Sequence, residues 1–121
     1  MKELRAGVLV VKKSRFYAHL YEIERIDEID EILKMHRKMY RKAVHHCWAV
    51  VLEDGTERFK DDGEVGHPGR VLLQVLKKHG AKNRAIVVSR VFGGVKLGVG
   101  GVSRAFRDAG EGLFVEKDNE R

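Results

Sequence analysis

The residues of this chain best suited to chemistry lie in a glycine-rich segment and among the basic residues around it. Residues 93–101 contain five glycines, and the neighbouring residue patterns predict a strand before the segment and a helix after it. A helix N-terminus offers unpaired N–H groups and a partial positive charge, which suit an anion such as RNA phosphate. We therefore expect an anion- or RNA-binding surface that includes Lys13, Arg15, Arg90, Gly93, Gly94, Lys96, Gly98, Gly100, Gly101 and Arg104.

The same glycines have a purely structural alternative, since a tight strand-to-helix crossover also needs residues without side chains. The segment lacks the Gly-Lys-Ser/Thr ending of a Walker P-loop. Ser103 stands where the dinucleotide-binding fingerprint has its third glycine. The sequence therefore predicts no nucleotide cofactor, and no other cofactor is expected.

A second candidate is the acidic segment Asp61, Asp62, Gly63 and Glu64, which precedes a helix predicted to begin near Pro68. Its carboxylates could ligate a divalent cation, or could simply lie favourably at the helix start. Together with His45 and Cys47 they could also build a small metal-dependent hydrolase. We assign neither metal ligands nor catalytic residues, because no second ligand pair or orienting residue follows at a recognised spacing.

Composition limits the classes of protein that fit. The chain has 121 residues and a formal net charge of +6, with an isoelectric point near 9.6. This length suits one domain, residues 1–121. The basic balance favours anionic partners, although it also fits an ordinary solubility charge. With one cysteine, Cys47, an internal disulfide cannot form. No apolar stretch reaches the ~18 residues of a membrane span, so we expect a soluble cytoplasmic protein without membrane contact.

Hydrophobic periodicity predicts a mixed set of elements. Short apolar or β-branched runs predict strands over residues 6–11, 16–23, 45–52, 57–60 and 84–92. Spacings of three and four residues predict helices over residues 26–42, 69–79 and 102–115. We predict an α+β fold: a two-layer sandwich of about four to five mostly antiparallel strands, with three helices on one face.

Four segments, in order, resemble the signatures of the IMPACT/YigZ family. They are Lys13 to Phe16, Ala43 to Ala49, Asp61 to Glu64, and Val88 to Phe106 with its double-glycine and Gly-x-Gly-Gly pattern. Residues 65–69 depart from the family pattern, because this segment is one residue shorter and has His67 where the family has threonine. The resemblance implies that relatives carry an additional domain, ferredoxin-like in bacteria and RWD in eukaryotes, and we expect neither within these 121 residues.

The resemblance implies a fold like the second domain of the fifth small-subunit ribosomal protein and domain four of elongation factor G. It also implies a connection with translation, because eukaryotic relatives regulate translation initiation under stress. We expect a non-enzymatic module that contacts RNA, the ribosome or a translation-regulating protein through the glycine-rich loop. The alternatives are a regulator that binds only protein and the metal-dependent hydrolase; the oligomeric state stays open.

Overall fold

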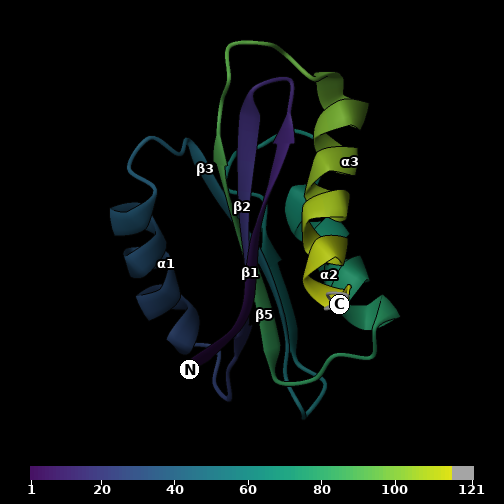
Figure 1. The fold of residues 1–121 in the computed structure, drawn as a ribbon. Helices are drawn as coiled ribbons and strands as arrows, with labels where there is room; N and C mark the ends of the chain where they lie inside the picture. The colour runs from purple at the N-terminus through teal and green to yellow at the C-terminus, as the bar shows by residue number, and fades with distance from the viewer. Residues whose placement is uncertain (116–121) are drawn as a thin grey trace, which may run out of the picture.

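The computed structural model describes residues 1–115, which form one five-stranded sheet with helices on both faces (Figure 1). The sheet has the order β1-β2-β5-β3-β4, and every neighbouring pair is antiparallel. Its strands are β1 (Lys2–Val11), β2 (Ser14–Glu22), β3 (His45–Val51), β4 (Glu57–Lys60) and β5 (Arg84–Val91). The helices are α1 (Glu28–Met39), α2 (Pro68–Lys78) and α3 (Gly98–Glu111), and a 3-10 turn (Gly112–Phe114) follows α3.

The predicted α+β class and the antiparallel strands are confirmed, but the placement of all three helices on one face is wrong. Helices α2 and α3 cover one face of the sheet, and α1 covers the other (Figure 1). Successive side chains of a strand alternate between faces. Phe16 of β2 accordingly packs in the cluster beneath α2 and α3, whereas Tyr21 packs with Ile32 of α1. Because the central strands are apolar on both faces, both faces need cover, and the molecule has three layers instead of two.

One end of the sheet carries the basic and glycine-rich segments. The β1–β2 turn and the loop from β5 to α3 lie at the top of Figure 1, and the C-terminal end of α1 is directed toward the same end. The turn residues Lys12 and Lys13 adopt left-handed backbone conformations, with φ of 46° and 69°. Helix α3 begins at Gly98, four residues earlier than the sequence predicted, so that its first turn is built largely from the glycine-rich segment. The helix N-terminus therefore reaches further into this segment than expected.

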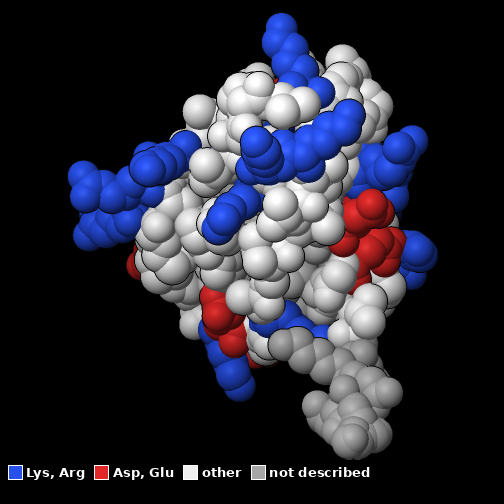
Figure 2. Space-filling view, turned by 45° about the horizontal axis from the view of Figure 1, so that its top comes forward, with Lys and Arg blue, Asp and Glu red and all other residues white. Residues whose placement is uncertain are grey.

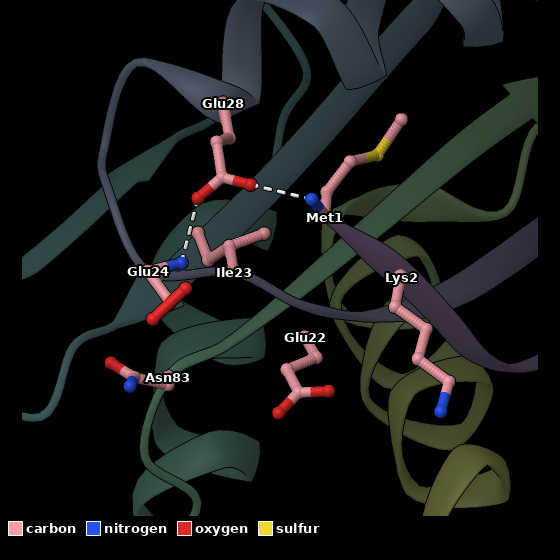
Figure 3. A pocket seen from close by; sticks show the side chains of 7 residues that line it. All are labelled: Met1, Lys2, Glu22, Ile23, Glu24, Glu28 and Asn83. Atoms are coloured by element: carbon pink, nitrogen blue, oxygen red, sulfur yellow. Dashed lines mark hydrogen bonds and ion pairs between the residues drawn. The ribbon is translucent and has the colours of Figure 1, made fainter.

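The opposite end of the sheet is acidic. A hollow of about 310 Å³ there is lined by Glu22, Glu24 and Glu28, together with Lys2 and the N-terminal ammonium group of Met1 (Figure 3). That ammonium lies 2.7 Å from Oε1 of Glu28, whose Oε2 accepts hydrogen bonds from the N–H groups of Glu24 and Arg25. The ammonium contact and the backbone hydrogen bonds lower the pKa of Glu28 to about 2. Both oxygens of the Glu28 carboxylate are thus engaged in contacts within the protein and are not free to bind an external cation.

Within residues 1–115, no helix has the length and apolar character needed to cross a membrane.

Candidate nucleic-acid interface

Gly93 fixes the glycine-rich loop against the β1–β2 turn. A Cβ atom added to this residue would lie 2.1 Å from the carbonyl carbon of Lys13 and 2.5 Å from the nitrogen of Ser14. Its N–H donates a hydrogen bond to Ser14 Oγ at 3.1 Å. Any side chain at this position would separate the two segments, so the glycine serves close packing and its amide is not free for a ligand.

The first turn of α3, by contrast, has backbone N–H groups that no capping side chain occupies. Leu97 at the N-cap gives the helix no side-chain hydrogen bond, and the first turn contains no acidic residue. Gly98 has a φ of 74°, which favours glycine. A Cβ at Gly100 would meet nothing within 4 Å, and its φ is not in the left-handed region. The fold gives no steric reason for glycine at position 100, although glycine there costs helix stability of roughly 1 kcal/mol relative to alanine.

A groove of about 230 Å³ lies between the end of β1 and the first half of α3. Lys12 and Arg104 line it together with Gly101, although the turn and the helix are far apart in the sequence. The groove also contains one carboxylate, Asp108, at the end further from the helix start. Of the predicted set, Gly101 and Arg104 line this groove; the second cation, Lys12, lies next to the predicted Lys13 but was not itself in that set.

The cations around this groove are available to a ligand. Within residues 1–115, no ion pair engages the exposed side chains of Lys12, Lys13, Lys96 or Arg104. Figure 2 shows lysine and arginine side chains across the upper part of this end of the molecule, whereas the acidic side chains gather lower down. Here we call Lys12, Lys13, Lys96, Arg104 and the first turn of α3 the glycine-loop face.

Arg15 does not belong to this face. Phe16 packs beneath α3, so alternation along β2 directs Arg15 and Tyr17 to the opposite side of the sheet. There Arg15 lines a second groove together with Arg41 and Lys42. The predicted basic residues therefore do not share one surface, because Arg104 lines the first groove and Arg15 lines the second.

Arg90 does not fit the predicted role in anion binding. Its side chain is buried, and Nη1 lies 2.9 Å from Oε2 of Glu64, whose side chain is equally buried. Its guanidinium carbon lies 5.3 Å from the ring centre of Phe16 and 5.7 Å from that of Phe92. A guanidinium held between two rings and neutralised by a carboxylate cannot reach an external phosphate. We therefore correct this prediction: Arg90 is a structural residue beneath the loop.

The Arg90–Glu64 pair belongs to a network that joins the segments of the family resemblance. Ser14 Oγ lies 3.4 Å from Nη2 of Arg90, and the ring Nε2 of His45 lies 3.8 Å from Oε1 of Glu64. The same ring donates a hydrogen bond from Nδ1 to the carbonyl oxygen of Asp62 at 2.8 Å. One residue or more from each segment thus meets in a single polar cluster that fixes the acidic loop, the β1–β2 turn and the end of β5 relative to one another.

The acidic loop is also held from its own side. Asp61 accepts a hydrogen bond from the Gly69 N–H at the start of α2, and Asp62 accepts one from the His46 N–H of β3, both at 2.8 Å. Gly66 in the shortened segment lies against α3, since a Cβ there would be 3.0 Å from the carbonyl oxygen of Val99. Two carboxylates of this loop therefore bind α2 and β3, and its Gly66 backbone packs against the start of α3.

These contacts leave the hydrolase alternative without a preformed site. Among residues 1–115, no three histidine, cysteine or acidic side chains are grouped so that they could hold a metal ion. Cys47 is fully buried and donates a hydrogen bond from Sγ to the carbonyl oxygen of Asp61 at 3.2 Å. Burial raises the pKa of the Cys47 thiol far above its usual range, so the thiol stays protonated and is a poor nucleophile.

Sequence reasoning missed the aromatic and basic residues of the second groove. Tyr17, Tyr40, Arg41 and Lys42 come from β2 and from the segment after α1, and they meet only because α1 lies on the unexpected face. The alternation of β2 could have shown that Arg15 and Tyr17 share a face. Nothing in the local sequence could have shown that the end of α1 lies beside them.

Comparison with known proteins gives one consistent family. A model of the Impact N-terminal domain matches residues 12–114. The IMPACT family member YvyE of Bacillus subtilis is 39% identical over 117 residues, which cover 93% of this chain and 54% of YvyE. The IMPACT family member YigZ of Escherichia coli is 33% identical over 101 residues, which cover 79% of this chain and 50% of YigZ. The chain thus spans about half the length of these relatives.

Solved structures share the fold. A crystal structure of a hypothetical protein matches with a TM-score of 0.85 and 30% identity, covering 90% of this chain and 55% of the other. The two-domain translational regulator Yih1 matches with a TM-score of 0.54 and 23% identity, covering 88% of this chain and 47% of Yih1. At that identity, the likeness to Yih1 indicates a common architecture and nothing further.

Proposed function

The chain belongs to the Impact N-terminal domain family, as its four motif segments predicted, and on that premise we propose that it is a cytoplasmic, translation-associated binding module that contacts RNA through the glycine-loop face. The observation that carries the proposal is the groove in which Lys12 and Arg104 lie beside the uncapped start of α3. Cations and unpaired backbone N–H groups are the groups that hold phosphate in nucleic-acid complexes.

The form of RNA recognition follows from the residues available. The glycine-loop face has positive charge and exposed backbone. Its groove is lined by Lys12 and Arg104, by the apolar residues Val11, Leu97 and Ala105, and by one carboxylate, Asp108, further along α3. Contacts of this kind position phosphates and carry no sequence information. We expect salt-sensitive binding that is almost equal for different RNA sequences, as for a domain that contacts the RNA of the ribosome. The link with translation rests on the family resemblance, in which eukaryotic members regulate translation.

A protein partner is the second candidate, and one observation favours it. Phe92, Val95 and Val99 lie in or next to the glycine-rich loop, and their side chains are 46%, 41% and 61% exposed. Apolar side chains gathered next to bare backbone can bury area against a protein surface. This candidate predicts a partner that binds through these three residues and no binding of free RNA.

The experiment that tests the proposal measures RNA affinity by fluorescence anisotropy with a labelled RNA at about 50 mM salt, a concentration at which phosphate contacts are strong. Arg104→Ala and Lys12→Ala should each weaken binding, and each should reduce the slope of log affinity against log salt by roughly 0.7–0.9 per lost phosphate contact. Arg25→Ala is the matched control, because Arg25 is exposed but lies next to Asp27 at the acidic end of the sheet.

The control should bind RNA as the wild type does. Equal losses in Arg104→Ala and Arg25→Ala would mean that net charge alone drives binding and that the glycine-loop face has no special role. If the wild-type protein binds no RNA at low salt, the proposal is wrong. In that case, a partner whose binding is abolished by Val99→Asp would support the second candidate.

A further inference from the structure

The second groove at this end of the sheet has a chemistry of its own. It encloses about 420 Å³ between the start of β2, the end of β5 and the segment that follows α1. Besides Arg15, Arg41 and Lys42, it is lined by Tyr17 and Tyr40. Its volume is within the range of small-molecule sites, and it lies on the α1 side of the sheet, separated from the glycine-loop face.

The aromatic wall of this groove is held rigidly. The rings of Tyr17 and Tyr40 are stacked, with centroids 4.3 Å apart and planes inclined by 16°. The Tyr40 hydroxyl lies 2.6 Å from Nε2 of His19, and Nδ1 of that ring lies 2.7 Å from the carboxylate of Glu3. In the neutral His19 ring, Nδ1–H donates a hydrogen bond to the Glu3 carboxylate, and Nε2 accepts the hydrogen bond that the Tyr40 hydroxyl donates. Both half-buried rings are therefore positioned before any ligand arrives.

The charge of the groove has no partner in the fold. Arg15, Arg41 and Lys42 are exposed, and within residues 1–115 none of them forms an ion pair. Among the residues that the structure describes, no acidic side chain lines the groove. The dipole of α1 gives little reason for Arg41 and Lys42, because the helix ends at Met39 and Arg37 and Lys38 already occupy its last turn.

Stacked aromatic rings beside unpaired cations suit a ligand that combines a flat ring with negative charge. A nucleotide has both, and base stacking on tyrosine with phosphate at arginine is how proteins hold single-stranded nucleic acid. An acidic peptide would use the cations but would gain nothing from the tyrosines. The lining therefore favours a nucleotide over a peptide.

We propose that this groove binds one nucleotide of single-stranded RNA, with the base against the Tyr17–Tyr40 pair and the phosphate at Arg15 and Arg41. This assignment adds a specific site to the proposed function, and the choice of RNA as the ligand rests on that function. It gives the domain a preference for unpaired RNA that the glycine-loop face alone does not provide, because a base within a duplex cannot reach the tyrosines.

The test compares labelled single-stranded oligouridylate with a double-stranded RNA of equal length. Tyr17→Leu should weaken single-strand binding by about 5- to 100-fold, the range for losing one stacked base, and should leave duplex binding within about twofold of wild type. Tyr17→Phe is the matched control, since it keeps the ring, and should bind both RNAs as the wild type does. Arg41→Ala is a second variant outside the core and should weaken single-strand binding even if Tyr17→Leu fails to fold.

A second readout separates this inference from the proposed function. Uridine monophosphate titrated into the isotopically labelled chain should shift the amide resonances of Tyr17 and Tyr40, and the shifts should disappear in Tyr17→Leu. If these shifts occur but no RNA binds at low salt, the groove is a nucleotide site, and the proposed function is wrong together with the RNA context that rests on it. If Arg104→Ala weakens RNA binding while Tyr17→Leu and Arg41→Ala leave it unchanged, the groove assignment is overturned and the proposed function stands. Displacement of the nucleotide by oligoglutamate at equal concentration would also overturn it.

Discussion

Replacing His36 by glutamine should flatten the pH dependence of folding stability on the acid side of neutrality. His36 lies on α1 with no exposed surface, between Tyr21 and Ser89 of the sheet. Its Nε2 lies 2.8 Å from the Tyr21 hydroxyl, and its Nδ1 lies 2.7 Å from Ser89 Oγ, which also contacts Nδ1 of His46 at 2.7 Å. A neutral ring satisfies both contacts by accepting from Tyr21 and donating to Ser89.

Burial and the neighbouring histidines His19 and His46 lower the pKa of His36 to about 3. In the unfolded chain the pKa returns to about 6.5. Between these two values the unfolded state binds more protons than the folded state, so stability falls as the pH falls. Linkage of these two pKa values gives a loss of about 2 kcal/mol between pH 7.5 and pH 5, as an upper bound.

Urea denaturation at a series of pH values measures this loss. With a slope of about 1–2 kcal/mol per molar urea, the wild-type midpoint should fall by roughly 1–2 M between pH 7.5 and pH 5. His36→Gln lowers stability at every pH, because glutamine cannot make both hydrogen bonds, so the readout is the slope and not the level. His67→Gln is the matched control, since the His67 side chain is 74% exposed, and it should keep the wild-type slope.

Subtracting the variant curve from the wild-type curve removes the carboxylates common to both, including Glu28, whose lowered pKa of about 2 affects stability only in more acidic solution. If the two curves run parallel between pH 7.5 and pH 5, His36 does not remain neutral in the folded protein. The interpretation of the Tyr21–His36–Ser89 contacts as an uncharged network would then be wrong.

Two further substitutions separate folding from binding. Gly100→Ala should raise the free energy of unfolding by up to about 1 kcal/mol, because alanine favours the helix and its Cβ meets nothing within 4 Å, yet it should weaken RNA binding at the glycine-loop face. If Gly100→Ala is more stable and binds RNA as well as the wild type does, RNA binding does not need an exposed backbone at this position. Glu64→Gln should destabilise the fold by about 3–5 kcal/mol in urea, because it leaves Arg90 buried without a counter-charge. Glu31→Gln, at an exposed position of α1, is the matched control. A loss of stability below about 1 kcal/mol in Glu64→Gln would mean that water reaches the Arg90 site.

The elements of the fold could be predicted from periodicity, and their layering could not. The strand over residues 45–51 and the helix over residues 68–78 follow directly from their apolar spacing. Alternation along β3 also places His45 and Cys47 on one side of the sheet and His46 on the other, and the structure has them there. The face that α1 covers depends on contacts between Ile29 or Ile32 and strands far away in the sequence, and no local pattern encodes such contacts.

Arg90 shows how one residue of a predicted site can have a different role from its neighbours in the sequence. Basic charge beside a glycine-rich loop predicts an anion site, and for Lys12 and Arg104 the structure provides a groove with that chemistry. Arg90 has the same charge and the same sequence neighbourhood, but it points inward from β5. Its neutralising partner, Glu64, is 26 residues earlier. Only the register that places β5 beside β2 and β3 brings these two side chains together.

Within the segments that carry the family resemblance, the buried residues and the residues proposed to touch RNA have different roles. Ser14, His45, Glu64 and Arg90 fix one another beneath the surface, whereas the groups offered to a ligand are the lysines of a turn, one arginine and the backbone of a helix start. These buried contacts fix the backbone N–H groups at the start of α3 in position and leave them exposed to a ligand. Buried substitutions should consequently lower stability and binding together, whereas substitutions at the glycine-loop face should lower binding alone. If Arg104→Ala, a variant at the glycine-loop face, lost stability in proportion to its loss of RNA affinity, this division of roles would be wrong.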